Sequence, residues 1–208
     1  MKLVVLGATG GTGLQVLSLA TRRGHTVTAV VRSPEKLGEF NGHVSAIQGD
    51  LLSESQLKNA IQGQDAALSA FGSRTPESRK EANLLRQFAV ALTTAMQEAN
   101  VHRLVVVSTA FLFKDSVIPP THLFGKLFFP VTMADAEEME TIIQSSGLDW
   151  TIVRPPRLTD KAATGKYRVR EGHLPSLGFT VSRADLASFM VQTVETGSFS
   201  NKIAGISN

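Results

Sequence analysis

The sequence contains no cysteine and no long apolar run. Without cysteine, disulfides, thiolate nucleophiles and cysteine-based metal sites are excluded, so any redox chemistry needs a borrowed cofactor. The apolar run at residues 3–6 is too short for a membrane span or a signal-peptide core, and it leads directly into a glycine turn. We therefore expect a cytoplasmic protein that does not associate with a membrane.

A strong charge of one sign is also missing. Lys and Arg number 21 and Asp and Glu 18, and this net charge of +3 is scattered along the chain. It suits a small polyanionic ligand and argues against a nucleic-acid surface. The five histidines include no His-x-x-x-His pair, so we expect no metal site. No Gly-x-Ser-x-Gly or Walker sequence occurs, which disfavours hydrolases and nucleoside triphosphatases.

Short, continuous apolar runs alternate along the chain with helical patterns, as is typical of parallel strands covered on both faces. We expect strands over residues 2–6, 26–31, 44–48, 66–70, 104–108 and 150–153, and helices over 78–100, 134–145 and 183–196. This pattern predicts an α/β fold of the Rossmann type, a doubly wound parallel sheet in one domain over residues 1–208. Residues 111–133 and 155–180 break the pattern, and we expect these irregular stretches to supply the substrate site.

A glycine-rich turn follows the first expected strand and opens an apolar helix. Gly7 would permit the tight turn, Gly10 the close approach of backbone to a pyrophosphate, and Gly13 the packing of helix on strand. This context predicts a bound nicotinamide dinucleotide, and a turn that only links strand to helix is the alternative. The expected contacts are Gly7, Thr9, Gly10, Gly11, Thr12 and Gly13.

Arg32 ends the second expected strand, where an enzyme that prefers NAD carries an acidic residue for the ribose hydroxyls. Together with Lys36 it can clamp a 2′-phosphate, because a guanidinium offers a planar fork of donors and stacks on adenine. We therefore expect NADP(H) as the cofactor. The alternative is a solvated pair of surface charges.

Further cofactor contacts are expected after the third, fourth and sixth strands, at the same edge of the sheet. Asp50 can accept a hydrogen bond from the adenine amino group, or it can serve a turn or a helix cap. Gly72 lets the backbone approach the ribose, and Arg74 is expected to point into the cleft. The full set is Asp50, Leu51, Phe71, Gly72, Arg74, Pro155 and Leu158.

These motifs together resemble the atypical short-chain dehydrogenases/reductases over nearly the whole chain. The runs Ser108-Thr109-Ala110-Phe111-Leu112 and Arg154-Pro155-Pro156-Arg157-Leu158 are similar to the biliverdin reductase B family of NADPH-dependent flavin reductases. That resemblance implies a monomer that transfers hydride to a planar acceptor, either a free flavin or a biliverdin-type tetrapyrrole. The NmrA-like proteins are similar over the first half, and they imply the alternative of a non-catalytic NADP(H) sensor.

The chain departs from the typical superfamily at its proton-transfer site. A typical member uses a Tyr-x-x-x-Lys pair, in which the lysine lowers the pKa of the tyrosine. The single tyrosine here, Tyr167, is followed four residues later by Glu171, so the usual secondary-alcohol dehydrogenase mechanism is excluded.

The biliverdin reductase B pattern has a serine and a histidine where this chain has Thr109 and Arg157. We predict that Ser108 and Thr109 orient the substrate or the nicotinamide amide. An arginine cannot shuttle a proton near neutral pH, so we predict that Arg157 attracts an anionic acceptor or the cofactor phosphates. In the alternative, the two hydroxyls cap a loop and Arg157 forms a structural ion pair.

Two other groups of residues invite an interpretation. Asp135, Glu137, Glu138 and Glu140 are expected on the solvated first turns of a helix, without a chemical role. The aromatic residues between 111 and 129 favour a flap over a flavin ring, with a small separate core as the alternative. This flap would consist of Phe111, Phe113, Phe124, Phe128 and Phe129.

Overall fold

The computed structural model describes residues 1–40, 42–72, 83–116 and 120–208. Its strands are β1 Lys2–Leu6, β2 Thr26–Val31, β3 Ser45–Gln48, β4 Ala66–Ser69, β5 Arg103–Val107, β6 Asp149–Arg154, β7 Arg157–Thr159, β8 Arg168–Glu171, β9 Thr180–Ser182 and β10 Lys202–Ser207. Its helices are α1 Gly11–Arg22, α2 Glu54–Ile61, α3 Leu84–Glu98, α4 Thr121–Phe128, α5 Pro130–Ser145 and α6 Arg183–Thr196, with 3-10 helices η1 Pro34–Phe40 and η3 Ala110–Leu112.

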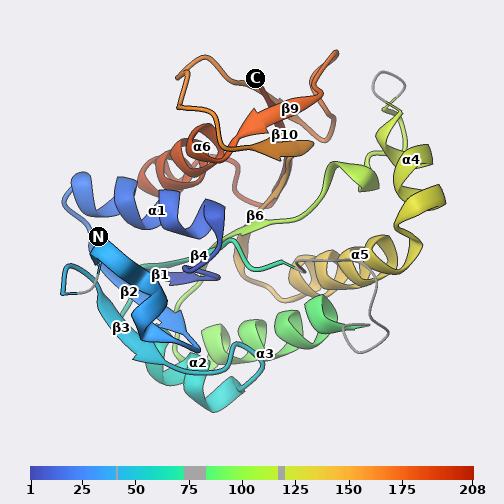
Figure 1. Cartoon of the computed structure of the whole chain (residues 1–208). Helices are drawn as coiled ribbons and strands as arrows, with labels where there is room; N and C mark the ends of the chain where they lie inside the picture. The colour runs from blue at the N-terminus through green and yellow to red at the C-terminus, as the bar shows by residue number, and fades with distance from the viewer. Residues whose placement is uncertain (41, 73–82, 117–119) are drawn as a thin grey trace.

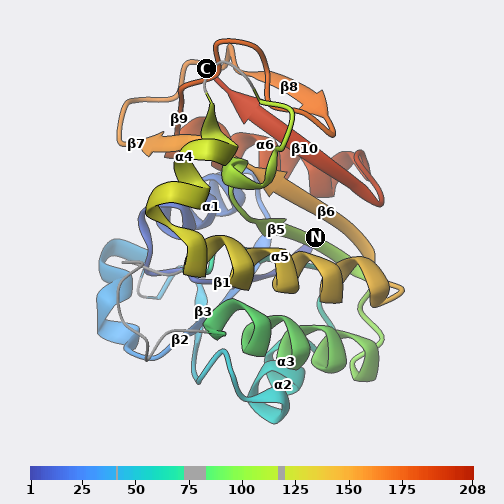
Figure 2. The same ribbon diagram turned by 90° about the vertical axis from the view of Figure 1, so that its right-hand side faces the viewer.

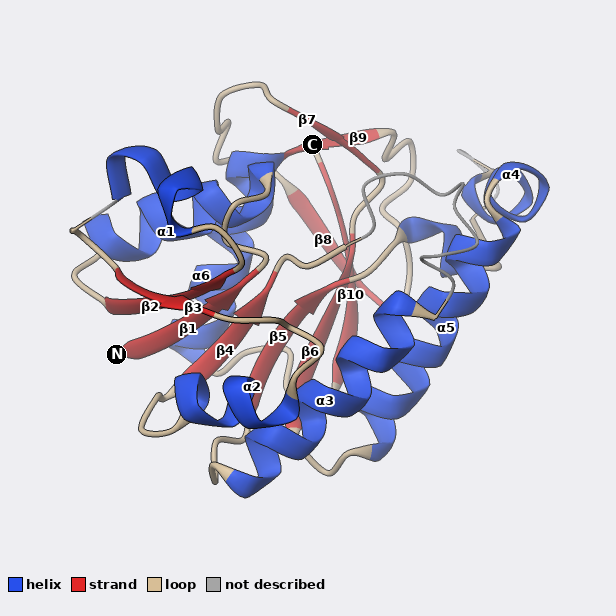
Figure 3. Cartoon of the chain, turned by 60° about the horizontal axis from the view of Figure 1, so that its bottom comes forward, coloured by secondary structure: helices blue, strands red, loops and turns tan. Residues whose placement is uncertain are grey.

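Figure 1 shows the whole chain, and its central sheet, whose strands are all labelled in Figure 3, has the strand order β3-β2-β1-β4-β5-β6-β10-β8. Its strands pair in parallel except for the edge strand β8, which runs antiparallel to β10. From β1 the chain continues to β2 and β3 on one side of it, and then crosses back to β4 on the other side, so the strand order reverses at β1. Ligands of open α/β sheets bind at such a switch point, beyond the carboxyl ends of the strands.

Helices cover both faces of the sheet (Figures 2 and 3). Helices α1 and α6 pack on one face, around Leu17 and Met190. Helices α2, α3 and α5 pack on the other, around Phe88 and Met139. Because both faces are covered, the apolar residues 3–6 of β1 have no exposed surface. Among the described residues, no helix is long and apolar enough to cross a membrane.

The predicted fold class is confirmed, and the bounds of α6 are as expected. The expectation of irregular structure over residues 111–133 was wrong, because α4 and the first turn of α5 lie there. Gly125 lowers the helical propensity of α4, but a Cβ at Gly125 would lie 2.7 Å from both Met133 Sδ and Phe111 Cβ. Close packing therefore requires glycine inside this helix.

The helix expected over residues 78–100 begins at Leu84, after Asn83 in the left-handed conformation with φ of 70°. Residues 78–82 lie outside the described residues. The strands β7, β8, β9 and β10 were not predicted, and β7 and β8 lie in the stretch 155–180 that was expected to be irregular. The sequence Arg168-Val169-Arg170-Glu171 of β8 has only one apolar residue, as an exposed edge strand allows.

Buried Asp185 fastens the segment after β7 and the end of the chain to the start of α6. Its carboxylate accepts hydrogen bonds from the backbone N–H groups of Thr164 and Gly165, from Ser182 Oγ, and from Asn208 Nδ2 at 2.7 Å. Burial alone would raise the pKa of Asp185, but these hydrogen bonds outweigh it and lower the pKa to about 2. The Asp185 carboxylate thus holds together the segment after β7, the start of α6 and the end of the chain.

We predict that Asp185→Asn lowers the free energy of unfolding at pH 7 by roughly 3 kcal/mol, because an amide presents a donor to the donors of Ser182 and Asn208. The folded pKa of Asp185 lies below the unfolded value, so its stabilisation is present above about pH 5 and is lost as pH falls toward 2. Urea unfolding at several pH values should therefore show the gap between wild type and variant closing in acid. The exposed Asp160→Asn is the control, and an equal loss in both variants would contradict this role.

Candidate functional site

The glycine turn has the conformation that a dinucleotide needs. Gly7 has φ of +74°, and a Cβ there would lie 2.7 Å from the backbone nitrogen of Phe71. A Cβ at Gly13 would lie 2.2 Å from the carbonyl oxygen of Gly7, so α1 and β1 can pack this closely only through a glycine. The predicted conformational roles of these two glycines are confirmed.

Gly10 differs, because the nearest atom that a Cβ there would meet is the Gly7 oxygen, at 3.3 Å. The protein itself leaves space in front of Gly10, as a site for close backbone approach by a ligand requires. Gly10 is the N-cap of α1, with no side-chain cap, and the first turn holds no acidic residue. The first N–H groups of the helix, which have no intrahelical acceptor, therefore favour an anion.

A crevice of about 370 Å³ extends from this turn across the carboxyl ends of β1, β2 and β4; we call it the cofactor crevice. It brings together eight of the predicted cofactor contacts: Gly7, Thr9, Gly10, Arg32, Asp50, Leu51, Phe71 and Gly72. Of the other predicted contacts, Gly11, Thr12, Gly13 and Lys36 are not part of its lining, and Arg74 lies outside the described residues.

Arg32 is exposed at the rim of the cofactor crevice, and no carboxylate among the described residues pairs with it. Its guanidinium is therefore free to meet a phosphate. Asp50 is partly engaged, since its Oδ1 accepts from the Leu52 N–H at 3.0 Å. This local turn is the alternative that the sequence left open for Asp50, and it occupies one of the two carboxylate oxygens.

A second hollow of about 580 Å³, the acceptor cavity, lies beyond the carboxyl ends of β5 and β6, and β5 pairs with β4, whose carboxyl end borders the cofactor crevice. Ser108 and Thr109 reach it from β5, and Arg157 reaches it from β7. The structure thus brings the three predicted catalytic residues together. Pro155 and Leu158 line this cavity rather than the cofactor crevice.

Aromatic rings form much of the wall of the acceptor cavity. Phe111 and Phe129 stack with ring centroids 5.5 Å apart, and Phe124 packs against both. All three line the cavity. The expected flap was wrong for Phe113, which is buried with its ring 4.9 Å from the guanidinium carbon of Arg154. Phe128 does not line the cavity and is exposed on α4.

A buried ion pair underlies the acceptor cavity. Glu140 on α5 accepts from Arg154 Nη2 at 2.5 Å and from Arg154 Nε at 2.9 Å, and Ser108 Oγ donates to Glu140 Oε1 at 2.5 Å. The Glu140 side chain is only 3% exposed. The expectation that Glu140 lies on a solvated face was wrong, because α5 begins at Pro130 and turns this residue inward.

Asp135 was also placed wrongly on the solvated face. It is buried, and its two carboxylate oxygens accept from the backbone N–H groups of Leu85 and Arg86, each at 2.9 Å. Asp135 therefore caps the first turn of α3 from a neighbouring helix. Glu137 and Glu138 are exposed, as predicted.

The sequence did carry a signal for Glu140. Met133, Ala136, Glu140 and Ile143 recur at three- and four-residue spacing, so a carboxylate stands in the apolar stripe of a helix. Burial of an unpaired charge is costly, and such a position points to a distant cationic partner.

The hydrogen bonds of Ser108 and Thr109 give their hydroxyls opposite roles. Ser108 donates its proton to Glu140, so it presents lone pairs toward a ligand. Thr109 Oγ1 accepts from the Phe111 N–H at 3.2 Å and caps η3, and no acceptor among the described residues takes its proton. Thr109 thus combines the loop-capping alternative with a free donor.

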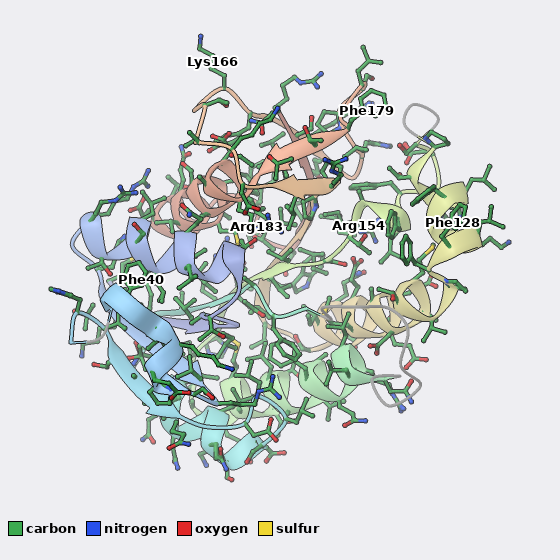
Figure 4. All side chains as sticks on the ribbon, in the orientation of Figure 1. Phe40, Phe128, Arg154, Lys166, Phe179 and Arg183 are labelled. Atoms are coloured by element: carbon green, nitrogen blue, oxygen red, sulfur yellow. The ribbon has the colours of Figure 1, made fainter. Side chains whose placement is uncertain are left out.

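Arg157 is exposed and pairs with no carboxylate among the described residues, so the structure does not show the structural ion pair that was its alternative. Sequence reasoning missed Arg183, which pairs with Asp160 at 2.7 Å. A Cβ at Gly11 would lie 2.8 Å from Arg183 Nε, so this cation lies over the start of α1 (Figure 4). In the described part of the chain, no three His, Asp or Glu side chains gather as metal ligands.

The sequence pattern of the NAD(P)H-binding family matches residues 7–196, from the first glycine of the turn to the end of α6. The chain belongs to this family. Its fold is the single Rossmann-type α/β domain with which such proteins bind NAD(P)H, as in the atypical short-chain dehydrogenases/reductases. The glycine turn, its open space at Gly10 and the cofactor crevice fit the dinucleotide that the family binds.

Relatives within the NAD(P)H-binding family align with most of the chain. Protein YwnB of Bacillus subtilis is 30% identical over 175 residues, which cover 81% of this chain and 78% of YwnB. The oxidoreductase stcQ of Emericella nidulans is 28% identical over 214 residues, covering 92% of this chain and 76% of stcQ. This chain aligns with only 61% of the length of a relative from Arabidopsis thaliana.

Among solved structures, one from Streptococcus pneumoniae is named as a candidate NADH-flavin reductase. It superposes with a TM-score of 0.82 and is 28% identical, and the match covers 100% of this chain and 99% of that protein.

We predict that Glu140→Ala lowers the free energy of unfolding by about 3–5 kcal/mol, because it leaves the Arg154 charge buried without a partner. The melting temperature should fall by about 10 °C. Glu137→Ala, on the exposed side of the same helix, is the matched control and should cost less than about 0.5 kcal/mol. Replacing both partners, as in Glu140→Leu with Arg154→Met, should recover stability relative to Glu140→Ala. Equal melting temperatures for Glu140→Ala and Glu137→Ala would show that the ion pair is unimportant.

Proposed function

We propose that the protein is an NADPH-dependent reductase that transfers hydride to a planar acceptor such as a free flavin, with biliverdin-type tetrapyrroles as a second class of acceptor. The observation that carries this proposal is the acceptor cavity, which is lined by aromatic rings and by Ser108 and Thr109 and lies at the same carboxyl edge of the sheet as the cofactor crevice. Its volume of about 580 Å³ lies in the usual range for small-molecule sites.

NADPH is preferred over NADH in this proposal because of Arg32. This arginine stands at the end of β2 on the rim of the cofactor crevice, without a carboxylate partner among the described residues. A guanidinium there attracts a 2′-phosphate and cannot accept hydrogen bonds from two ribose hydroxyls, as an acidic residue would. Lys36, exposed on η1, follows Arg32 by four positions and is the second cation of this proposal.

The chemistry comes from the cofactor: bound NADPH supplies a hydride, and with it two electrons, while solvent supplies the acceptor's second proton. The protein binds the cofactor and the hydride acceptor and orients them toward each other. The Ser108 oxygen accepts a hydrogen bond from the amide N–H of the nicotinamide, and the Thr109 hydroxyl donates one to the flavin or tetrapyrrole. Arg157 offsets the negative charge that develops on the reduced ring.

The absence of a proton-donating Tyr/Lys pair limits the acceptors that this site can reduce. A flavin or a tetrapyrrole spreads the added charge over a conjugated ring and takes its proton from water, so stacking and alignment suffice. The pneumococcal protein named as a candidate NADH-flavin reductase has the same fold over its full length, which supports this acceptor class.

A non-catalytic NADP(H) sensor is the second candidate function. The structural hydrogen bonds of Ser108 and Thr109 favour it, because both hydroxyls already stabilise the fold. Tight binding of NADPH without turnover of any acceptor would establish the sensor.

We predict that Arg32→Ala weakens NADPH binding by about tenfold to a hundredfold and leaves NADH binding within about twofold, because only NADPH carries the 2′-phosphate. Fluorescence titration with both cofactors measures this. Arg86→Ala, which removes an exposed arginine on α3, is the control and should change neither affinity. Equal affinities of the wild type for NADPH and NADH would refute the assignment of NADP(H).

We predict that the wild type oxidises NADPH with FMN, FAD, riboflavin or biliverdin as acceptor, and that Thr109→Val lowers kcat/KM by about tenfold through loss of one hydrogen-bond donor. Thr141→Val, on the exposed surface of α5, is the matched control for removal of a hydroxyl. Stopped-flow absorbance at 340 nm separates binding from hydride transfer. Identical rates for the wild type and Thr109→Val would remove Thr109 from the mechanism.

A further inference from the structure

An apolar stripe runs along the solvent side of α4. Leu123, Phe124, Leu127 and Phe128 are 67%, 49%, 69% and 58% exposed, although apolar side chains of this size normally pack inward. At spacings of one, four and five residues they occupy one side of the helix. The opposite side packs inward through Gly125, which leaves the stripe uncovered.

The stripe is continuous with the acceptor cavity. Phe124 lines the cavity and is also half exposed, and its ring lies 4.7 Å from that of Phe128. An apolar surface therefore leads from inside the cavity onto the outer side of α4. Lys126 lies two positions after Phe124, on the other side of the helix, so the stripe itself carries no charge.

The opposite lip of the cavity is also apolar. Phe179 lines the cavity and is 53% exposed, and the nearby Leu177 is 63% exposed with φ of +58°. This left-handed conformation is unfavourable for leucine. Figure 4 shows Phe179 and Phe128 on separate elements at the same side of the molecule. A hydrogen bond between His173 Nδ1 and Asp115 Oδ2 connects the loop before β9 to the segment after η3.

The charges of the site distinguish a small polar ligand from an amphipathic one. Arg157 is the one charged residue among the described residues that line the acceptor cavity, and it comes from β7 rather than from α4. Toward α4 the lining is Phe111, Phe124 and Phe129, with Pro120 and with Thr121, whose hydroxyl donates to the carbonyl oxygen of Ala110. A flavin ring fits the same cavity, but the phosphate or hydroxylated chain of a flavin nucleotide would have to point to solvent, because polar groups laid along these rings would lose water without gaining a partner.

We propose that the preferred acceptor is a planar ring with a long apolar tail, in the manner of a prenylated quinone, and that the tail leaves the cavity between Phe124 and Phe179 and lies on the α4 stripe. This inference rests on the proposed reductase function and specifies its substrate class. In this reduction the quinone takes one hydride from NADPH and one proton from solvent and becomes a quinol, while NADPH becomes NADP⁺.

The test uses 2-methyl-1,4-naphthoquinone without a tail and the same ring with one, two or three isoprene units. Calorimetric titration without NADPH should show Kd falling roughly fivefold for each unit, because each unit buries further apolar surface. The KM for the quinone, measured by NADPH oxidation, should fall in parallel with this Kd. Affinities that do not depend on tail length would overturn the inference, and if the ring without a tail is reduced, the reductase function would stand. Failure to reduce any acceptor would instead refute the proposed function.

Variants locate the tail. Leu127→Glu should raise Kd for the three-unit quinone about tenfold and flatten the dependence on tail length, because it places a charge on the stripe. Val90→Glu is the matched control, since Val90 is 49% exposed on α3, which does not contribute to the acceptor cavity. Circular dichroism verifies that both variants fold. A tail effect that persists in Leu127→Glu would overturn the proposal.

Two other occupants of the stripe would also overturn it. If a second copy of the chain covers the stripe, sedimentation should show a dimer at micromolar concentration that Leu127→Glu dissociates. If a lipid surface covers it, the protein should co-sediment with phosphatidylcholine vesicles through Leu127 while tail length leaves Kd unchanged. A monomer that does not bind vesicles and whose Kd falls with tail length supports the tail-binding stripe.

Discussion

A buried carboxylate–guanidinium pair organises the acceptor side of this protein. Glu140 and Arg154 connect α5 to the end of β6, and Arg154 Nη1 also donates to the carbonyl oxygen of Leu112 in η3 at 3.1 Å. Because Ser108 donates to the same carboxylate, the end of β5 joins this network. The positions of Ser108, η3 and the Pro155-Pro156 turn therefore depend on a single desolvated charge pair, whose energy is favourable only while both partners are present.

The cofactor side depends on backbone conformation instead. Gly7 and Gly13 allow β1, α1 and the start of the segment after β4 to approach more closely than any side chain permits. In the proposed complex with NADPH, the open space at Gly10 would receive the pyrophosphate, and the exposed Arg32 would receive the 2′-phosphate. Since β1, β4, β5 and β6 are neighbours in one parallel sheet, the cofactor crevice and the acceptor cavity share its carboxyl edge.

Local patterns predicted the parts of this architecture that local physics determines. Continuous apolar runs and glycine spacing identified the first six strands of the sheet and the dinucleotide turn, because burial on both faces and the left-handed conformation of Gly7 leave a direct mark on the sequence. Helix α4 was missed because its apolar side faces solvent, and β8 because its charged residues lie at an exposed edge. The roles of Asp135 and Glu140 depend on partners 50 and 14 residues away, which periodicity alone does not specify.

We propose that one bound NADPH connects the two halves of the site, with its 2′-phosphate at Arg32 and its nicotinamide at the apolar acceptor cavity. A crystal structure of the complex with NADP⁺ and FMN tests this connection most directly. It should show the 2′-phosphate within hydrogen-bond distance of the Arg32 guanidinium, the nicotinamide amide beside Ser108, and the flavin ring stacked on the nicotinamide in the acceptor cavity. A 2′-phosphate remote from Arg32, or a nicotinamide ring outside the acceptor cavity, would contradict it.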